Sequence, residues 1–583
     1  MGMAIGSNIG LRRARPLMAA ISITLATMPA SAQLQSAPPA KQQADLILTG
    51  GEIYTPTGWA NAMAVRGGAI LAVGDVAAID GYRAAATKVV DLGGKAVLPG
   101  FHDMHVHPLF GGQMMISCVL KREATPAEIT STIKACAAKR KPGEWITGGS
   151  WVNSVFKDKP QDKALLDEAA PNNPVILSDE TGHSSWVNSA ALRAAGITRS
   201  TADPLNGVIE KRPDGEPNGL LRESAAGLVR AKVPPPTPAD NMAAARRAMQ
   251  EMVSNGVTSL QDAFANADSL TAFAALSDAG ELKPRLKACL GWAFNISGTD
   301  SAFEAVYAQR SSYRRERLKP DCVKIVNDGV PGEGHTAAML EPYEEVLPGE
   351  KDDKRKFGIM NTPPDVLKKM VTRFDQDGMS MLIHCTGDAC ARAAVDAIEA
   401  ARKANGYSGL LHQVGHDNFT TLADLQKGRS LGATFEFSAY LYYLNGVTQV
   451  YRRAIGAKRF ERYKPVRDTI DSGALALEGS DWPVSPSVDP WTAVETLVTR
   501  QKPGGGGEKL GAGQAITLKE VIDIYTVNGA RQWGHSDAVG QLRPGYLADM
   551  IVLSQNPFKV PITDVHKTRV LTTFINGEQV YSR

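Results

Sequence analysis

Apolar runs separated by glycine-containing turns mark both ends of this chain. Leu46 to Thr49 leads into Gly50-Gly51, and Val570 to Ile575 leads into Asn576-Gly577. Gly-Gly and Asn-Gly loops favour hairpins because both turn positions need positive φ. β segments at opposite ends of a chain most economically form one small sheet domain, so we expect the two ends to pair.

The middle of the chain has a different period. Thr237-Pro238 begins a segment with apolar residues at helical spacing through Met252, and Val257 to Leu260 follows as a strand. Alternation of this kind over about 430 residues predicts a parallel α/β fold. A bare barrel needs roughly 250 residues. Insertions are therefore expected, the largest between about Gly143 and Pro236, which is rich in Pro, Asn and Gly.

Composition and charge narrow the function. The 583 residues include 43% hydrophobic and 21% charged positions, which is ordinary for a folded protein and excludes a disordered, collagenous or coiled-coil chain. Lys and Arg number 64 against 61 Asp and Glu, and Arg12, Arg13 and Arg15 account for the whole excess. The rest of the chain is neutral, so nucleic acid is not an expected partner.

The N-terminus has the layout of an export signal. The three arginines precede an apolar stretch from Leu17 to Met28, and Ala30-Ser31-Ala32 follows as an A-x-A cleavage site. The stretch is shorter than the roughly 20 residues that span a bilayer. We predict a signal peptide over 1–32, cleavage after Ala32, a periplasmic or secreted mature protein, and no stable membrane anchor.

Six cysteines are present and none forms a C-x-x-C pair, so a structural zinc site is not expected. Cysteines can pair in an oxidising compartment. We predict a Cys118–Cys136 disulfide because these residues flank one strand-helix unit. The alternative is that all six are small buried apolar side chains.

The segment Pro99 to His107 carries the strongest local signal. His105 and His107 are two positions apart, which places both imidazoles on one face of a strand. Two neutral imidazoles facing one cavity suit a divalent metal such as zinc. A chance surface pair is the alternative.

Four further polar residues lie at or near the ends of predicted strands: Lys324, His384, His416 and Asp481. Lys324 falls inside an apolar run, where an amine is costly to bury without a partner. Barrel enzymes build their sites at the carboxyl ends of the strands. Each residue alone could be a helix cap or a satisfied core group, but together they predict one site.

The chain here resembles the amidohydrolase superfamily, and most closely its family 3 branch, which includes N-substituted formamide deformylase. The resemblance extends from about Ala44 to Gln579. The motifs that carry it are Leu98-Pro99-Gly100-Phe101 with Asp103, His105 and His107; Gly182-His183 with Asn188-Ser189; Gly219-Leu220 with Glu223; Gly256-Val257-Thr258 with Asp262; Val323-Lys324 with Asp328-Gly329; His384 with Gly387-Asp388; His416; Gly479-Ser480-Asp481; Thr526 with Asn528 and Ala530; and Gly545-Tyr546-Leu547-Ala548-Asp549.

This resemblance implies an α/β fold, namely a distorted (β/α)8 TIM barrel with a small β-sandwich domain formed from both chain ends. The expected division of the mature chain is residues 33–98 and 536–583 for the two parts of the β-sandwich domain and residues 99–535 for the barrel, with its insertion at about 143–236.

The resemblance also implies roles for single residues. His105 and His107 would bind the more buried of one or two divalent ions, most simply Zn²⁺, and His384 and His416 the second. Lys324 matches a position that is often carboxylated by CO₂ and then bridges two metals. Asp481 would bind the first metal and transfer protons. His183 is a candidate for orienting the substrate carbonyl.

Four positions depart from the family pattern. Gly415 stands where a Glu usually precedes the fourth histidine, and His102 replaces an apolar residue. His335 falls in a loop of small or polar residues, and Trp482 follows Asp481 where a smaller residue is usual. Trp482 suggests an aromatic or bulky apolar small-molecule substrate, with a packing role as its alternative.

The predicted function is a secreted metal-dependent amidohydrolase that cleaves the C–N bond of an amide, an N-formyl group or a cyclic amide with a metal-activated hydroxide. Ester hydrolysis, deamination or decarboxylation on the same scaffold are alternatives. Deamination is disfavoured because no acid/base Glu follows His384. A non-catalytic periplasmic binding protein or pseudoenzyme is the alternative from another class, and a homo-oligomer is left open.

Overall fold

The structure is a computed structural model. It describes residues 42–121, 124–151, 156, 161–179, 184–204, 207–292, 300–332, 334–346 and 355–583. The predicted signal peptide and His183 lie outside the described residues. No helix among these residues is both long and apolar enough to cross a bilayer.

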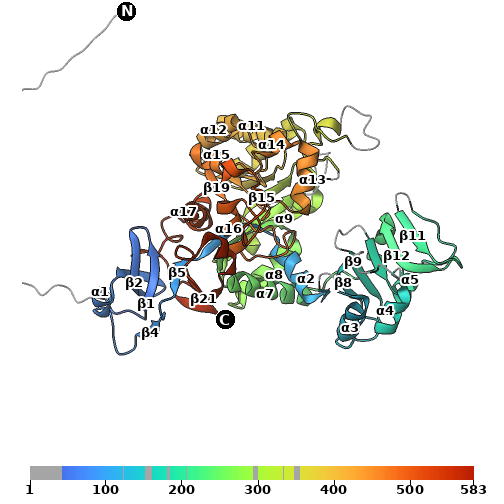
Figure 1. Cartoon of the computed structure of the whole chain (residues 1–583), viewed down its shortest axis with the longest axis horizontal. Helices are drawn as coiled ribbons and strands as arrows, with labels where there is room; N and C mark the ends of the chain where they lie inside the picture. Colours follow the sequence, from blue (N-terminus) through green and yellow to red (C-terminus); the bar gives the residue numbers. More distant parts are fainter. Residues whose placement is uncertain are drawn as a thin grey trace, which may run out of the picture. The chain divides into compact units, whose positions relative to one another are not determined.

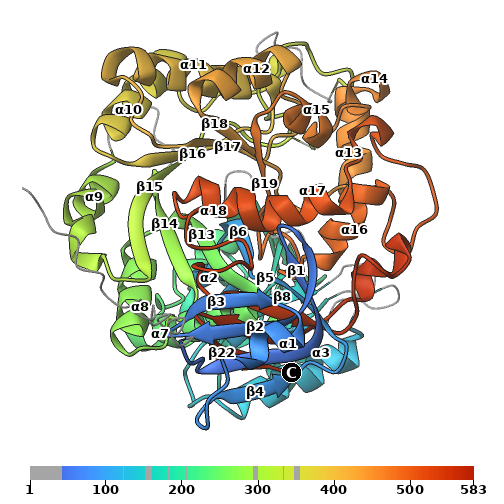
Figure 2. The same cartoon turned by 90° about the vertical axis from the view of Figure 1, so that its left-hand side faces the viewer.

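Eight parallel strands form a nearly closed barrel, which confirms the predicted (β/α)8 fold. Helices α10, α11 and α12 lie on the outer side of strands β16, β17 and β18 (Figure 2). In sequence order the barrel strands are β6 (Phe101–Val106), β13 (Val257–Ala265), β14 (Arg285–Trp292), β15 (Leu318–Val326), β16 (Ser380–His384), β17 (His412–Gly415), β18 (Ala433–Glu436) and β19 (Leu475–Leu477).

The surrounding helices begin where the sequence predicts. Pro238 stands in the first turn of α7, and Thr237 and Asp240 exchange hydrogen bonds in a capping box that satisfies backbone N–H groups at the helix start. The helices of the barrel region are α2 (Pro108–Ile116), α7 (Pro238–Ser254), α8 (Ala267–Asp278), α9 (Ser301–Tyr313), η2 (Arg355–Phe357), α10 (Pro364–Gln376), α11 (Asp388–Asn405), α12 (Leu422–Leu431), α13 (Gly446–Ile455), α14 (Ala457–Phe460), α15 (Val466–Asp471), α16 (Trp491–Thr499), η3 (Ala512–Gln514), α17 (Leu518–Asp523), η4 (Ile524–Asn528) and α18 (Gly529–Gln532).

The first and last barrel strands are joined by single hydrogen bonds. The Met104 amide donates to the Glu478 carbonyl at 2.9 Å, and the Asp481 amide donates to the His105 carbonyl at 2.7 Å. The buried Asp103 carboxylate accepts from the Ser480 amide at 3.0 Å and from the Ser480 hydroxyl at 2.6 Å. The segment after β19 is thereby held against β6.

Strands from both chain ends share one sheet, which confirms the predicted β domain formed from both ends. β5 pairs with β1 on one side and with β20 on the other, and Leu46, Val65, Val97, Met550 and Phe574 pack into a common core. The elements of this domain are β1 (Leu46–Thr55), β2 (Gly58–Arg66), β3 (Ala69–Gly74), α1 (Val76–Asp80), β4 (Lys88–Asp91), β5 (Ala96–Pro99), β20 (Met550–Leu553), η5 (Ile562–Lys567), β21 (Val570–Ile575) and β22 (Glu578–Ser582).

The segment between α2 and α7 forms a third, six-stranded sheet with cores of its own (Figure 1). Its first strand begins at Cys118, earlier in the chain than the expected start near Gly143. Its elements are β7 (Cys118–Val119), α3 (Pro126–Ala137), β8 (Ile146–Trp151), α4 (Lys163–Ala169), β9 (Val175–Asp179), β10 (Ser184–Val187), α5 (Ser189–Ala194), β11 (Gly207–Lys211), β12 (Pro217–Glu223) and α6 (Ser224–Arg230).

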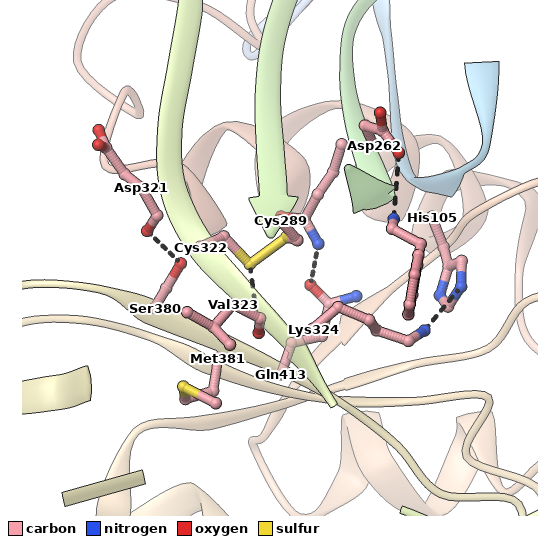
Figure 3. The surroundings of a disulfide bond; sticks show 12 residues. His105, Asp262, Cys289, Asp321, Cys322, Val323, Lys324, Ser380, Met381 and Gln413 are labelled. Carbon is pink, nitrogen blue, oxygen red and sulfur yellow. Dashed lines mark hydrogen bonds between the residues drawn. A yellow bond between two sulfur atoms is a disulfide. The ribbon is translucent and has the colours of Figure 1, made fainter. Parts of the chain in front are cut away.

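All six cysteines are paired. The predicted Cys118–Cys136 disulfide is confirmed, and it connects β7 to α3. Cys289 and Cys322 join the neighbouring strands β14 and β15 two residues before Lys324 (Figure 3). The third disulfide, Cys385–Cys390, connects the end of β16 to α11.

A buried carboxylate ties the outer helices to the barrel. Asp375 of α10 pairs with Arg402 of α11 at 2.8 Å and accepts from Nε2 of His412, the first residue of β17, at 2.9 Å. Burial raises the pKa of Asp375, but hydrogen bonds from His412, Ser408 and Asn405 outweigh it and hold that pKa below its usual value.

We predict that Asp375→Asn lowers the free energy of unfolding by about 3 kcal/mol, because it leaves Arg402 buried without its partner charge. The contribution of the wild-type carboxylate is present above about pH 4, the pKa of an unfolded Asp, and is lost as the pH falls. Denaturant titrations at pH 7 and in acid measure both effects. The exposed Asp365 of the same helix is the control, and Asp365→Asn should change stability by less than about 0.5 kcal/mol.

Candidate active site

One histidine within the first strand, a second just after it and one carboxylate after the last strand converge. His105 lies fully buried within β6, and His107 caps α2. Asp481 Oδ1 lies 3.3 Å from His107 Nε2 and 3.7 Å from His105 Nε2. The three donor atoms lie within 4.8 Å of one another, close enough to share one ion.

Lys324 and His416 reach the same place from other strands. The Lys324 side chain points from β15 to His105, and its Nζ lies 3.2 Å from His105 Nε2 (Figure 3). The His416 ring, just after β17, lies 4.3 Å from the His105 ring, and its Nδ1 lies 4.0 Å from Asp481 Oδ2. The structure therefore brings together five of the six predicted metal ligands.

His384, at the end of β16, stands beside this cluster. Its ring lies 4.4 Å from the His416 ring. Its Nε2 lies 3.1 Å from the Gly329 carbonyl oxygen and 3.5 Å from Asp328 Oδ1. Nε2 therefore faces these two oxygens in this structure, and His384 is not among the two groups of converging donors.

The backbone at two of these residues is unusual. His416 has φ 65° and Asp481 has φ 55°, which is the left-handed region that non-glycine residues seldom adopt. Such conformations cost roughly 1–3 kcal/mol each and persist where surrounding structure enforces them. For Asp481 that structure includes the amide bond to His105 and the neighbouring Ser480 held by Asp103.

Burial sets the protonation of the site. It lowers the pKa of His384 to about 3 and that of His105 and His416 well below the usual histidine value, and the Lys324 charge adds to the effect. These imidazoles are therefore neutral, which is the form that binds a metal. Burial also lowers the pKa of Lys324 to about 8, although Asp481 and Glu436 oppose it.

Glu436 was not predicted from the sequence as a residue of the site. It is the last residue of β18, is fully buried, and its Oε2 lies 2.9 Å from His105 Nδ1. Burial raises its pKa, and Lys464 opposes the shift. The signal in the sequence was a carboxylate directly after the short segment Ala433-Thr434-Phe435.

The side chains at the three unusual aromatic or histidine positions pack against other residues. His102 is buried against Gly529 and lies edge-on to Trp533. The His335 ring stacks on Tyr343 at 4.3 Å. Trp482 is 6% exposed, and its ring fills the space beside Gly111 of α2, so it packs within the barrel core and presents no open aromatic wall.

Imidazole nitrogens and carboxylate oxygens converging in a buried space are the donor set of a divalent transition metal such as zinc. The residues present therefore fit one ion at His105, His107 and Asp481. His416 and Lys324 lie close enough to complete its surroundings or to hold a second ion.

A barrel with this donor cluster at the carboxyl ends of its strands defines a metal-dependent hydrolase. The chain belongs to the amidohydrolase family, whose profile matches residues 88–581.

Relatives of similar length agree with this family. The chain is 29% identical over 555 residues to the protein LONG AFTER FAR-RED 3 of Arabidopsis thaliana, covering 93% of each chain. It is 26% identical to N-substituted formamide deformylase of Arthrobacter pascens, covering 93% of this chain and 99% of the relative. An uncharacterised metal-dependent hydrolase from Pyrococcus horikoshii has the same fold, with TM-score 0.69, 22% identity, and coverage of 89% of this chain and 99% of that one.

We predict that Asp481→Asn lowers hydrolytic turnover by about 100- to 10,000-fold, the usual contribution of a general acid/base. The amide keeps the size of the side chain but cannot accept a proton. Asp489, whose carboxylate accepts from the Trp491 amide at the start of α16, is the matched control, and Asp489→Asn should retain turnover within about threefold. Full activity in Asp481→Asn would contradict the assigned role.

Proposed function

We propose that this chain hydrolyses the C–N bond of an amide, N-formyl or cyclic amide substrate that carries an apolar group. The observation that most supports this proposal is the position of Asp481. Its carboxylate lies within 4 Å of both His105 Nε2 and His107 Nε2. A carboxylate beside nitrogens that would bind an ion can bind the same ion and accept a proton from the reacting water.

Asp481 does the proton work in this proposal. A bound divalent ion lowers the pKa of water and polarises the substrate carbonyl. Asp481 accepts the proton from the attacking water as the new C–O bond forms. It then delivers that proton to the amide nitrogen as the C–N bond breaks, because an amine leaves poorly unless it is protonated.

In this proposal Lys324 is present either as a free amine or as a carbamate. Its lowered pKa, about 8, gives a fraction of neutral amine at neutral pH, and a neutral amine adds to CO₂ to form a carbamate with release of one proton. The carbamate would replace a buried cation with an anion beside His105, which suits a second divalent ion. The carbamate on Lys324 and zinc as the bound ion are both parts of this proposal.

Phe264 supports an apolar group on the substrate. Its ring lies over Gly291, where a Cβ would come within 2.5 Å of it. Gly291 pairs in register with Lys324, and paired residues on parallel strands face the same side, so the ring lies on the face that carries Lys324. It remains 36% exposed, a large open aromatic surface beside a polar site.

The proposal also includes the compartment in which the protein works, the periplasm or the cell exterior. Three disulfides suit an oxidising environment, and the signal-like N-terminus points to the periplasm or to secretion. N-substituted formamide deformylase, a relative of 26% identity whose name states its activity, supports C–N cleavage. A small molecule is the expected substrate, and a homo-oligomer stays open.

We predict that the zinc-loaded protein hydrolyses N-benzyl formamide or a related N-aryl or N-acyl amine faster than the matching ester. Release of the amine, measured by chromatography, tests the reaction class. The Asp481→Asn protein is the background control. Hydrolysis of the esters with no turnover of any amide would contradict the proposal.

We predict that Phe264→Ala raises KM for N-benzyl formamide by about 10-fold, since losing one aromatic contact costs roughly 1.4 kcal/mol. The KM for N-methyl formamide, which has no large apolar group, should change by less than about twofold. Trp59→Ala removes an exposed aromatic of β2 in the other domain and is the control. Equal effects on both substrates would show that Phe264 acts on the fold and not on the apolar group.

A further inference from the structure

We infer that Glu436 is a positioning residue, which orients His105 so that its Nε2 faces the ion. The inference rests on the metal-dependent activity proposed above. It adds a role for β18, a strand that supplied no residue to the ligand set expected from the sequence.

The contacts of the Glu436 carboxylate are all with hydrogen-bond donors. Its Oε2 lies 2.9 Å from His105 Nδ1 and accepts from the His416 amide at 3.2 Å. Its Oε1 accepts from the Ser438 amide. Both oxygens accept from backbone N–H groups and Lys324 Nζ, a donor, faces His105 Nε2, so the His105 proton is assigned to Nδ1. The lone pair of His105 is then on Nε2, the nitrogen that faces Lys324 and Asp481.

The same strand end holds a second histidine in the same way. His416 Nδ1 lies 3.0 Å from the Ser438 hydroxyl and 3.4 Å from the Ser438 carbonyl oxygen. Lys464 donates to the carbonyls of Phe437 and Ser438 at 2.6 Å and so fixes this turn. Residues 436–438 thus contact the Nδ1 of two ligand candidates, which leaves both Nε2 atoms for an ion.

Gly415 provides the room for this arrangement. A Cβ at that position would lie 3.3 Å from Glu436 Oε2 and 3.6 Å from His105 Nδ1. The departure noted in the sequence, a glycine where a Glu usually precedes the fourth histidine, therefore coincides with a carboxylate that reaches the same space from the neighbouring strand.

A direct role as a metal ligand is the competing reading, because His105, His416 and Glu436 also have donor atoms within 4.8 Å of one another. That reading would require His105 to bind through Nδ1. Both Glu436 oxygens already accept hydrogen bonds from the protein, and an ion there would displace the His105 proton. The observed contacts favour the positioning role.

The test is zinc binding by Glu436→Gln, measured by competition with a chromophoric chelator. Carboxylates that orient metal-binding histidines contribute about 10- to 100-fold to affinity. We expect the zinc Kd to rise by that factor while the number of ions bound at saturation stays that of the wild type. The visible spectrum of the cobalt-substituted variant should keep the wild-type band intensity, because the ligand set is unchanged.

Glu478→Gln is the matched control. Glu478 is equally buried at the end of the next strand segment, where its carboxylate accepts from Tyr442 and contacts no ligand candidate. Its zinc Kd should stay within about threefold of the wild type. Glu436→Asp, which keeps the charge but withdraws the oxygen from His105, should weaken zinc binding as Glu436→Gln does.

Three results would overturn the inference. They are an unchanged zinc Kd in both Glu436 variants, the loss of one bound ion at saturation with an altered cobalt spectrum, and an equal loss of affinity in Glu478→Gln. The wild-type protein separates this outcome from failure of the proposed function, since a wild type that binds zinc but hydrolyses no amide would contradict only the reaction assigned.

Discussion

The assembly of the site depends on the junction between the first and last barrel strands. β6 supplies His105, the residue between β6 and α2 is His107, and the segment after β19 supplies Asp481. Asp103 accepts two hydrogen bonds from Ser480 and a third from the His105 amide, so one carboxylate holds both sides of the junction. Hydrogen bonds within the protein therefore hold residues almost four hundred positions apart in the sequence side by side.

Burial then decides what these residues can do. In water a histidine is half protonated near pH 6.5, and repulsion would keep several such rings apart. Here burial lowers the pKa of His105, His384 and His416, so the rings can lie close together in the neutral state. Neutral imidazoles and an adjacent carboxylate favour the binding of a cation.

The sequence predicted the parts of the fold and site that depend on local pattern. The H-x-H spacing located His105, a lysine inside an apolar run located Lys324, and polar residues after strands located His416 and Asp481. The barrel brings the ends of all these strands to one face. The capping box at Thr237 and the paired β segments were also local signals.

Other features depended on tertiary contacts. The orientation of His384 toward Gly329 and the packing of Trp482 against Gly111 follow from neighbours that the sequence does not place. Glu436 ends a short strand segment, but only its 2.9 Å distance to His105 gave it a role. The separate sheet that begins at Cys118 was foreseen as an insertion, yet its start could not be predicted from Pro and Gly content, since β7 is two residues long.

The most direct test of the account is where a divalent ion binds. Anomalous diffraction from crystals of the zinc-loaded protein, collected at the zinc edge, locates the ion without reference to any activity. The account predicts a peak bonded to His105 Nε2, His107 Nε2 and Asp481. A well-occupied zinc bound elsewhere, with these three side chains left uncoordinated, would contradict it.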